Sequence, residues 1–229
     1  MLTQTMTRSS SRQTAGHNPH PVVEMNSYSF GTPIELVGAP MPFARNAEIY
    51  GENEPAEYLY KVVSGSVRTY KVLNDGRRQI GAFYLAGDVF GLEVSDEHTF
   101  SAEAIVNSKI LVVKRSTLVN LASRDNETAR KLWTMTAGEL QRVQAHILLL
   151  IKTAQERVAG FLLEMSARVP MGNEIDLPMS RQDIADYLGL TIETVSRTLT
   201  QLENIAAIAV PSSRRIVLRN RAALNRLNA

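Results

Sequence analysis

The sequence predicts an α+β protein with an N-terminal antiparallel β-roll or sandwich, a long helix that joins two copies, and a C-terminal winged helix-turn-helix. Three observations support this prediction. Short β-rich runs divided by turn residues fill residues 58–114, a helical period without proline occupies residues 119–152, and two short helical patterns meet at Gly189 before a basic hairpin. Regularly spaced strands with turn signals indicate antiparallel sheets, and apolar residues at intervals of three and four indicate helices.

The composition is that of an ordinary globular protein of 229 residues, long enough for two modules. The net charge is only +2, but the C-terminal end is strongly basic. From residue 197 onward the acid Glu203 is opposed by six arginines, which are Arg197, Arg214, Arg215, Arg219, Arg221 and Arg226. We expect this end to carry a positive field.

The sequence also narrows the possible function classes. It contains no cysteine, which excludes disulfides, zinc fingers and thiolate-held iron–sulfur clusters. No apolar run reaches the roughly 18 to 20 residues that a membrane helix needs, and the N-terminus lacks the apolar core of a secretory signal. We therefore expect a cytoplasmic protein that does not associate with a membrane.

Residues 1–27 form a polar stretch that contains proline and has no acidic residue before Glu24. Such a stretch cannot bury enough apolar surface to offset the entropy of folding, so we expect a disordered arm. An Arg/Ser-rich start also resembles an organellar transit peptide, although no basic amphipathic helix is visible.

Residues 28–118 are assigned to the β module. Its strand-like runs are YLYKVV, SVRTYKVL, RQIGAFYL, FSAEAIV and KILVV. The turn residues between them include Ser64-Gly65, Asn74-Asp75-Gly76, Gly87-Asp88 and Asn107-Ser108. Such turn residues between runs rich in β-branched and aromatic side chains predict successive antiparallel strands.

Residues 119–152 are predicted to form a dimerisation helix. From Trp133 to Ala154, residues recur at intervals that alternate between three and four, which is the spacing of a coiled-coil seam. A core helix within one subunit would show the same pattern, but the β module is too small to cover so long a seam. We therefore expect a symmetric homodimer. The predicted dimer contacts are Leu140, Val143, Ile147 and Leu150.

Residues 153–229 are expected to form the winged helix-turn-helix domain. Its first helix comes from TAQERVAGFLLEMSARV, and its period should turn Arg157, Glu164 and Arg168 toward solvent. A short helix from Arg181 to about Leu188 should follow, because Ser180 and Asp183 have the spacing of a capping box. Gly189 then supplies the turn, and Thr191 can cap the second helix of the motif.

The second helix should present Glu193, Ser196 and Arg197 on one face, opposite an apolar face. Arg can bond guanine O6 and N7 bidentately, Glu can accept from cytosine N4, and Ser can serve either role or meet the thymine methyl group. These three residues are therefore the predicted base-reading set. Glu193 and Arg197 could instead form a solvated salt bridge along the helix, worth a few tenths of a kcal/mol.

A basic hairpin completes the domain, since AAIAV and RIVLR flank the turn PSSR. A helix-turn-helix followed by such a hairpin is a winged helix, so we expect double-stranded DNA as the partner. The predicted phosphate contacts are Ser180, Arg181, Thr191, Thr194, Arg214 and Arg215.

With these residues, the chain resembles the cyclic AMP receptor protein and FNR superfamily of bacterial transcription regulators over about residues 28–229. The most specific part is RQDIADYLGLTIETVSRTL, whose E-x-x-S-R face resembles the FixK-like branch, and YKVVSGSV and GDVFG resemble the superfamily's cyclic-nucleotide-binding roll. The resemblance implies an activator of low-oxygen or nitrogen-related genes. It also implies contact with RNA polymerase and a palindromic, TTGAT-type site.

The β module departs from the superfamily's nucleotide-binding pattern at two places. Leu92 stands where nucleotide-binding members have a Glu for the ribose, with Glu93 adjacent, and Phe100-Ser101 replaces their phosphate-binding Arg-Ser pair. A buried phosphate without a charged partner is costly, so we expect no bound cofactor and no metal.

Two other function classes were weighed against this interpretation. One is a ligand-gated sensor, whose β module binds a small molecule other than a cyclic nucleotide. The other is an enzyme that uses the acidic residues and the histidine of the 88–98 segment. Because nothing nucleophilic or phosphate-cradling accompanies that segment, we expect no catalytic site.

Overall fold

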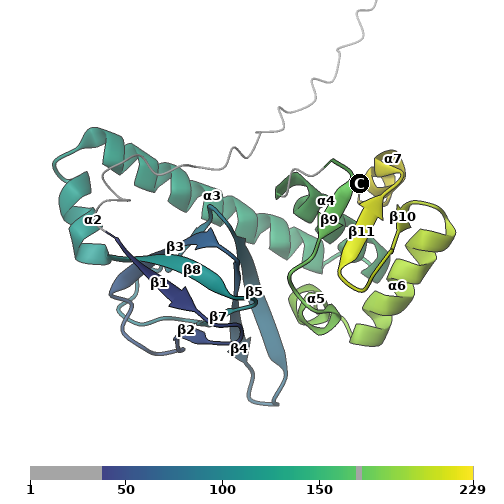
Figure 1. The fold of residues 1–229 in the computed structure, drawn as a ribbon, viewed down its shortest axis with the longest axis horizontal. Coiled ribbons are helices and arrows are strands. Elements are labelled where there is room, and N and C mark those ends of the chain that lie inside the picture. Colours follow the sequence, from purple (N-terminus) through teal and green to yellow (C-terminus); the bar gives the residue numbers. More distant parts are fainter. Residues whose placement is uncertain (1–37, 169–171, 229) are drawn as a thin grey trace, which may run out of the picture.

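The computed structural model of the protein describes residues 38–168 and 172–228. A β-roll and a winged helix-turn-helix module lie side by side, and the long helix α3 (Asn126–Leu150) leads from the roll toward the second module (Figure 1). The predicted α+β architecture is confirmed. The expected disordered arm, residues 1–27, lies outside the described residues.

Two four-stranded antiparallel sheets form the roll, with strand orders β1-β8-β3-β6 and β2-β7-β4-β5. Apolar side chains of the two sheets pack together in a buried core that includes Val62, Val67 and Ile110. The strands of the first sheet are β1 (Ala39–Phe43), β8 (Ser108–Lys114), β3 (Tyr58–Ser64) and β6 (Val89–Phe90). Those of the second are β2 (Glu48–Tyr50), β7 (Ser101–Ala104), β4 (Ser66–Val72) and β5 (Arg78–Leu85).

Three strands of the roll, β1, β2 and β6, were not predicted from the sequence. Strand β1 contains Pro40 and Pro42, which lack an N–H group and are tolerated at a sheet edge, where β1 pairs with β8 alone. Strands β2 and β6 have three and two residues, which is too short for an alternating pattern.

The continuous helix expected over residues 119–152 is a misassignment, because the structure has two helices there, α2 (Arg115–Ala122) and α3. Between them Asp125 has an extended backbone, and its carboxylate accepts hydrogen bonds from the N–H groups of Glu127 and Thr128. Because Asp is a favoured N-cap, this residue starts a new helix. All four predicted dimer contacts lie on α3.

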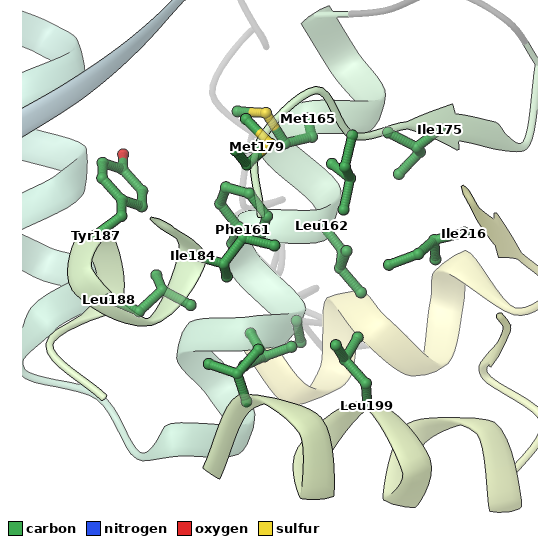
Figure 2. Close-up of a cluster of buried hydrophobic side chains, with 14 of the residues drawn as sticks. Phe161, Leu162, Met165, Ile175, Met179, Ile184, Tyr187, Leu188, Leu199 and Ile216 are labelled. Carbon is green, nitrogen blue, oxygen red and sulfur yellow. The ribbon is translucent and has the colours of Figure 1, made fainter. Parts of the chain in front are cut away.

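The C-terminal module has four helices and a small sheet among the described residues. Its core is built by side chains from α4, α5, α6 and the sheet, including Phe161, Leu162, Ile184, Leu199 and Ile216 (Figure 2). Its helices are α4 (Ala154–Arg168), α5 (Arg181–Leu188), α6 (Ile192–Asn204) and α7 (Arg221–Asn228). Its antiparallel sheet has the order β10-β11-β9, from β10 (Ile208–Ala209), β11 (Arg215–Leu218) and β9 (Glu174–Asp176).

The roll and the C-terminal module share one hydrophobic core. Phe83 of β5 packs against Tyr187 of α5, with ring centroids 5.1 Å apart, and meets Phe161 of α4 edge-on at 6.3 Å. Ile80 and Ile105 of the roll belong to the same buried cluster. The position of the helix-turn-helix relative to the roll is therefore fixed by apolar packing.

Because of this packing, the expectation that Arg157, Glu164 and Arg168 face solvent is wrong. The Arg168 side chain is buried, pairs with Asp88 in the turn before β6, and donates a 2.9 Å hydrogen bond to the Phe83 carbonyl. Arg157 and Glu164 are half-buried. Helical periodicity identified the apolar face of α4, but it does not reveal that the polar face lies against a second module.

Candidate DNA-binding surface

The helix-turn-helix consists of α5 and α6, and its turn depends on local capping. The Ser180 hydroxyl accepts a hydrogen bond from the Asp183 N–H, and the Asp183 carboxylate accepts one from the Ser180 N–H at 2.9 Å. Gly189 has a left-handed backbone with φ of 62°, which costs other L-residues roughly 1–2 kcal/mol. Thr191 caps α6 through the N–H of Thr194. The predicted caps and turn are confirmed.

The predicted base-reading residues Glu193, Ser196 and Arg197 are exposed on one face of α6. In the described part of the chain, no ion pair joins Glu193 to Arg197, so both charged groups are available to a ligand. Hydrogen bonds from its own N–H and from the Thr191 hydroxyl lower the pKa of Glu193, which stays an ionised acceptor at neutral pH. The opposite, buried face consists of Val195, Leu199 and Leu202.

The N-terminal end of α6 carries two of the predicted phosphate contacts. Thr191 is exposed and Thr194 is half-buried, and their hydroxyl oxygens lie 3.1 Å apart. The unpaired N–H groups and the positive end of the dipole make a helix N-terminus a favourable place for an anion. The geometry of this end therefore suits a phosphate oxygen.

Two further predicted phosphate contacts lie at the N-terminus of α5. The Ser180 hydroxyl is engaged in the cap and donates to Asp183 Oδ2 at 2.8 Å. The Arg181 guanidinium donates to the Ser213 carbonyl in the hairpin turn at 3.3 Å, and burial lowers its pKa. Arg181 thus ties α5 to the wing, so the two elements form one surface.

The wing itself provides Arg214 and Arg215. Arg214 is half-buried, whereas Arg215 is exposed and its guanidinium forms ion pairs with Glu174 at 2.8 Å and Asp176 at 3.3 Å on β9. These carboxylates partly neutralise Arg215, and a phosphate would have to compete with them. Such competition could not be foreseen from the sequence, because β9 pairs with β11 only in the folded sheet.

Sequence reasoning missed a buried ion cluster that joins α5 to the roll. Asp183 pairs with Arg68 at 3.2 Å and with Arg78 at 2.6 Å, and Arg78 also pairs with Asp186 at 2.8 Å. Arg68 in turn pairs with Glu103 at 2.7 Å. The first helix of the DNA-binding motif is therefore held by two arginines from strands β4 and β5.

The pKa of Asp183 is lowered by this environment. Burial alone would raise it, but the hydrogen bonds from Ser180 and the charges of Arg68 and Arg78 outweigh burial. A group whose pKa is lower in the folded than in the unfolded chain stabilises the fold above its unfolded pKa, about 3.9 for Asp. That contribution is lost as the pH falls through the folded pKa.

A second missed contact joins α3 to the helix-turn-helix. The His146 ring of α3 stacks on the Tyr187 ring at 4.0 Å, and its Nε2 lies 2.9 Å from the Tyr187 carbonyl oxygen. Burial lowers the pKa of His146, so the neutral ring with a proton on Nε2 fits this contact. Helix α5 is thus contacted by both the roll and α3.

The outer face of α3 is apolar and exposed. Trp133 is 75% exposed, Leu140 58% and Ile147 57%, and Val143 lies between them along the helix. Leu150, the fourth predicted dimer contact, is half-buried, and one of its methyl groups lies 3.8 Å from where a Cβ on Gly189 would be. Large apolar patches of this kind are typical of protein–protein interfaces.

Comparison with known proteins agrees with the geometry. A Crp-like helix-turn-helix domain matches residues 156–227, and a cyclic nucleotide-binding domain matches residues 40–125. The nitrogen fixation regulation protein FixK of Azorhizobium caulinodans is 54% identical over 202 residues, which cover 86% of this chain and 82% of that protein. The chain belongs to the cyclic AMP receptor protein/FNR superfamily, in its FixK-like branch.

Other relatives place this superfamily member among transcription regulators. The structure of FixK2 from Bradyrhizobium japonicum has a TM-score of 0.81 and 56% identity, and the match covers 84% of this chain and 98% of that one. The fumarate and nitrate reduction regulatory protein of Escherichia coli is 30% identical over 210 residues, which cover 89% of this chain and 84% of that protein. The expectation that the chain is not an enzyme is confirmed by these relatives. No helix in the described ranges is long and apolar enough to cross a bilayer.

We predict that Asp183→Asn lowers the free energy of unfolding by about 3 kcal/mol at pH 7, because it removes the charge that two arginines surround. The difference from wild type should begin to shrink below about pH 3.9, where Asp183 of the unfolded chain becomes protonated, and it is lost as the pH falls through the lower pKa of the folded state. Urea denaturation at several pH values measures both effects.

Asp186→Asn is the matched control, since among the described residues Asp186 forms an ion pair with one arginine, Arg78, and otherwise accepts a hydrogen bond from Gln182. Its cost should be about 1 kcal/mol. Equal losses for the two variants, or a loss for Asp183→Asn that persists unchanged at pH 3, would contradict the assigned cluster.

Proposed function

We propose that this protein is a homodimeric, sequence-specific transcription activator that reads an inverted repeat in double-stranded DNA without a bound cofactor. The observation that carries the proposal is the exposed face of Glu193, Ser196 and Arg197 on a helix whose opposite face is fully buried. Several matched relatives are named nitrogen fixation regulation proteins, which supports nitrogen-related or low-oxygen genes as targets. An activator also needs RNA polymerase as a partner. Because the proposed target is DNA, we expect the protein to act in the cytoplasm.

The chemistry of the reading face fits a TTGAT-type half-site. The exposed Arg197 guanidinium offers two parallel N–H donors to guanine, and the ionised Glu193 accepts from the amino group of a cytosine. Ser196, three residues after Glu193 and directly before Arg197, is small enough to lie against a thymine methyl group. Thr191 and Thr194 would then meet the adjacent phosphates at the helix N-terminus.

Dimerisation through α3 accounts for its exposed apolar side chains. Two copies packed along Leu140, Val143 and Ile147 would bury this stripe and relate the two reading helices by a two-fold axis. Successive major grooves on one side of the duplex are about 34 Å apart, so half-site centres roughly 10 to 11 base pairs apart suit such a dimer.

The interior of the roll supports operation without a cyclic nucleotide. Tyr60 and Tyr84 stack on Phe90 at 5.1 and 5.0 Å, so aromatic rings fill the core between the sheets. Phe100, which replaces the superfamily's phosphate-binding Arg, packs so closely on Gly81 that a Cβ there would lie 3.1 Å from its ring.

A ligand-gated sensor is the second candidate. It is favoured by the buried His98 ring, which stacks on Tyr50 at 3.5 Å and whose Nδ1 lies 3.3 Å from Glu93. His98 Nε2 and the Tyr50 hydroxyl are buried polar atoms without a protein partner in the described residues. The two candidates differ in whether the helix-turn-helix is fixed before any ligand binds.

For the dimer, we expect Ile147→Glu to convert the protein to a monomer, because a two-fold seam would place a carboxylate on each helix in an apolar contact. Sedimentation velocity measures the change. Gln141→Glu adds the same charge to an exposed position off the stripe and should leave the dimer intact. A dimeric Ile147→Glu protein with normal DNA affinity would show that α3 is not the interface.

For base reading, Arg197→Ala should cost about 1 to 3 kcal/mol per half-site and should relax the preference at one base pair alone. Fluorescence anisotropy with duplexes substituted at each position tests this. Arg219→Ala, an exposed arginine after β11, is the control and should change affinity about equally for all sequences. An Arg197→Ala protein that keeps the wild-type base preference contradicts the proposed reading face.

A further inference from the structure

The guanidinium of Arg157 connects three backbone carbonyl groups from different parts of the fold. Its Nε donates to the Lys152 carbonyl at 2.8 Å, and one terminal nitrogen donates to the carbonyls of Leu188 and Gly189 at 2.9 and 3.4 Å. Lys152 lies two residues past the end of α3, and Leu188 is the last residue of α5. One side chain on α4 therefore ties the end of the dimerisation helix to the turn of the helix-turn-helix.

The electrostatics of this contact are favourable. The C-terminal carbonyls of a helix have no partners within the helix and carry the negative end of its dipole. Arg157 places a positive charge and several N–H donors at the end of α5 and two residues past the end of α3. Hydrogen bonds from a charged donor are stronger than those between neutral groups.

The contact lies at the junction between α3 and α4, where the chain could otherwise change direction. Helix α3 ends at Leu150 and α4 begins at Ala154, and Thr153 with Glu156 starts the new helix through a 2.7 Å hydrogen bond from the Thr153 N–H to the Glu156 carboxylate. Only residues 151–153 connect the helices. A change in direction there would shift α6 relative to α3 and, in the proposed dimer, relative to its two-fold axis.

We propose that Arg157 is a positioning residue that sets the separation of the two reading helices, and hence the half-site spacing that the dimer accepts. The inference rests on the proposed dimeric function. Arg157 is assigned no base or phosphate contact. Its effect passes through the Gly189 turn, directly before the Thr191 cap and the first turn of α6.

The test compares wild type with Arg157→Gln on inverted repeats whose half-sites are separated by the best spacing or by one or two base pairs more or fewer. Fluorescence anisotropy on each duplex, and on a duplex with one half-site, gives the spacing profile and the base preference. Arg157→Gln should reduce the ratio between the best and neighbouring spacings about tenfold, the factor for one lost charge-assisted contact. Its base preference within a single half-site should not change. A variant that had lost its fold would lose this preference as well.

Arg157→Lys is the conservative variant, and it should relax the spacing profile less, because an ammonium group can still reach one or two of the carbonyls. If Arg157→Gln does not fold, the profile of Arg157→Lys decides: a relaxed profile supports the inference and an unchanged one overturns it. Arg130→Gln, which removes an exposed charge from α3, is the control and should retain the wild-type profile.

The outcomes separate this inference from the proposed function. A wild-type protein that binds all spacings equally overturns the dimeric reading model and the role of Arg157 with it. A wild type with a sharp optimum, matched by an equally sharp optimum in Arg157→Gln, overturns the role of Arg157 alone.

Discussion

The buried carboxylate of Asp183 lies where the two modules meet and joins them together with the apolar core that they share. It completes the capping box that starts α5, and it pairs with Arg68 and Arg78 from two strands of the roll. A carboxylate in such a place is stable only if all its partners are present, because an unpaired buried charge is very unfavourable. The cap and the docking of α5 are therefore coupled through a single side chain, and α6 follows α5 directly after the Gly189 turn.

Around this carboxylate the other contacts between modules follow one pattern, in which a charged or aromatic group from α3 or the roll contacts α4 or α5. Arg168 reaches Asp88 and His146 stacks on Tyr187, while Phe83 extends the apolar core across the boundary. All these contacts form between side chains of the protein itself. These direct contacts between the roll and the helix-turn-helix are the physical basis for the proposal that DNA binding needs no cofactor.

The sequence predicted those features whose causes lie within a few residues. The Ser180 cap, the left-handed Gly189 and the alternation of buried and exposed residues along α6 are all local. The cluster at Asp183 was not predictable, because Arg68 lies 115 positions away and nothing in a local pattern pairs the two. For the same reason Arg157 and Arg168 were predicted to face solvent, and the ion pairs between Arg215 and the carboxylates of β9 were not foreseen.

We propose that the helix-turn-helix is already fixed in the ligand-free protein. Because the chain has no cysteine, Gln201→Cys on the exposed side of α6 provides a unique spin-label site in each subunit. For the proposed dimer, double electron–electron resonance on the DNA-free protein should give one narrow distance distribution that saturating cyclic AMP leaves unchanged. A broad or two-peaked distribution that narrows only when cyclic AMP or another ligand is added would contradict the account and favour a gated sensor.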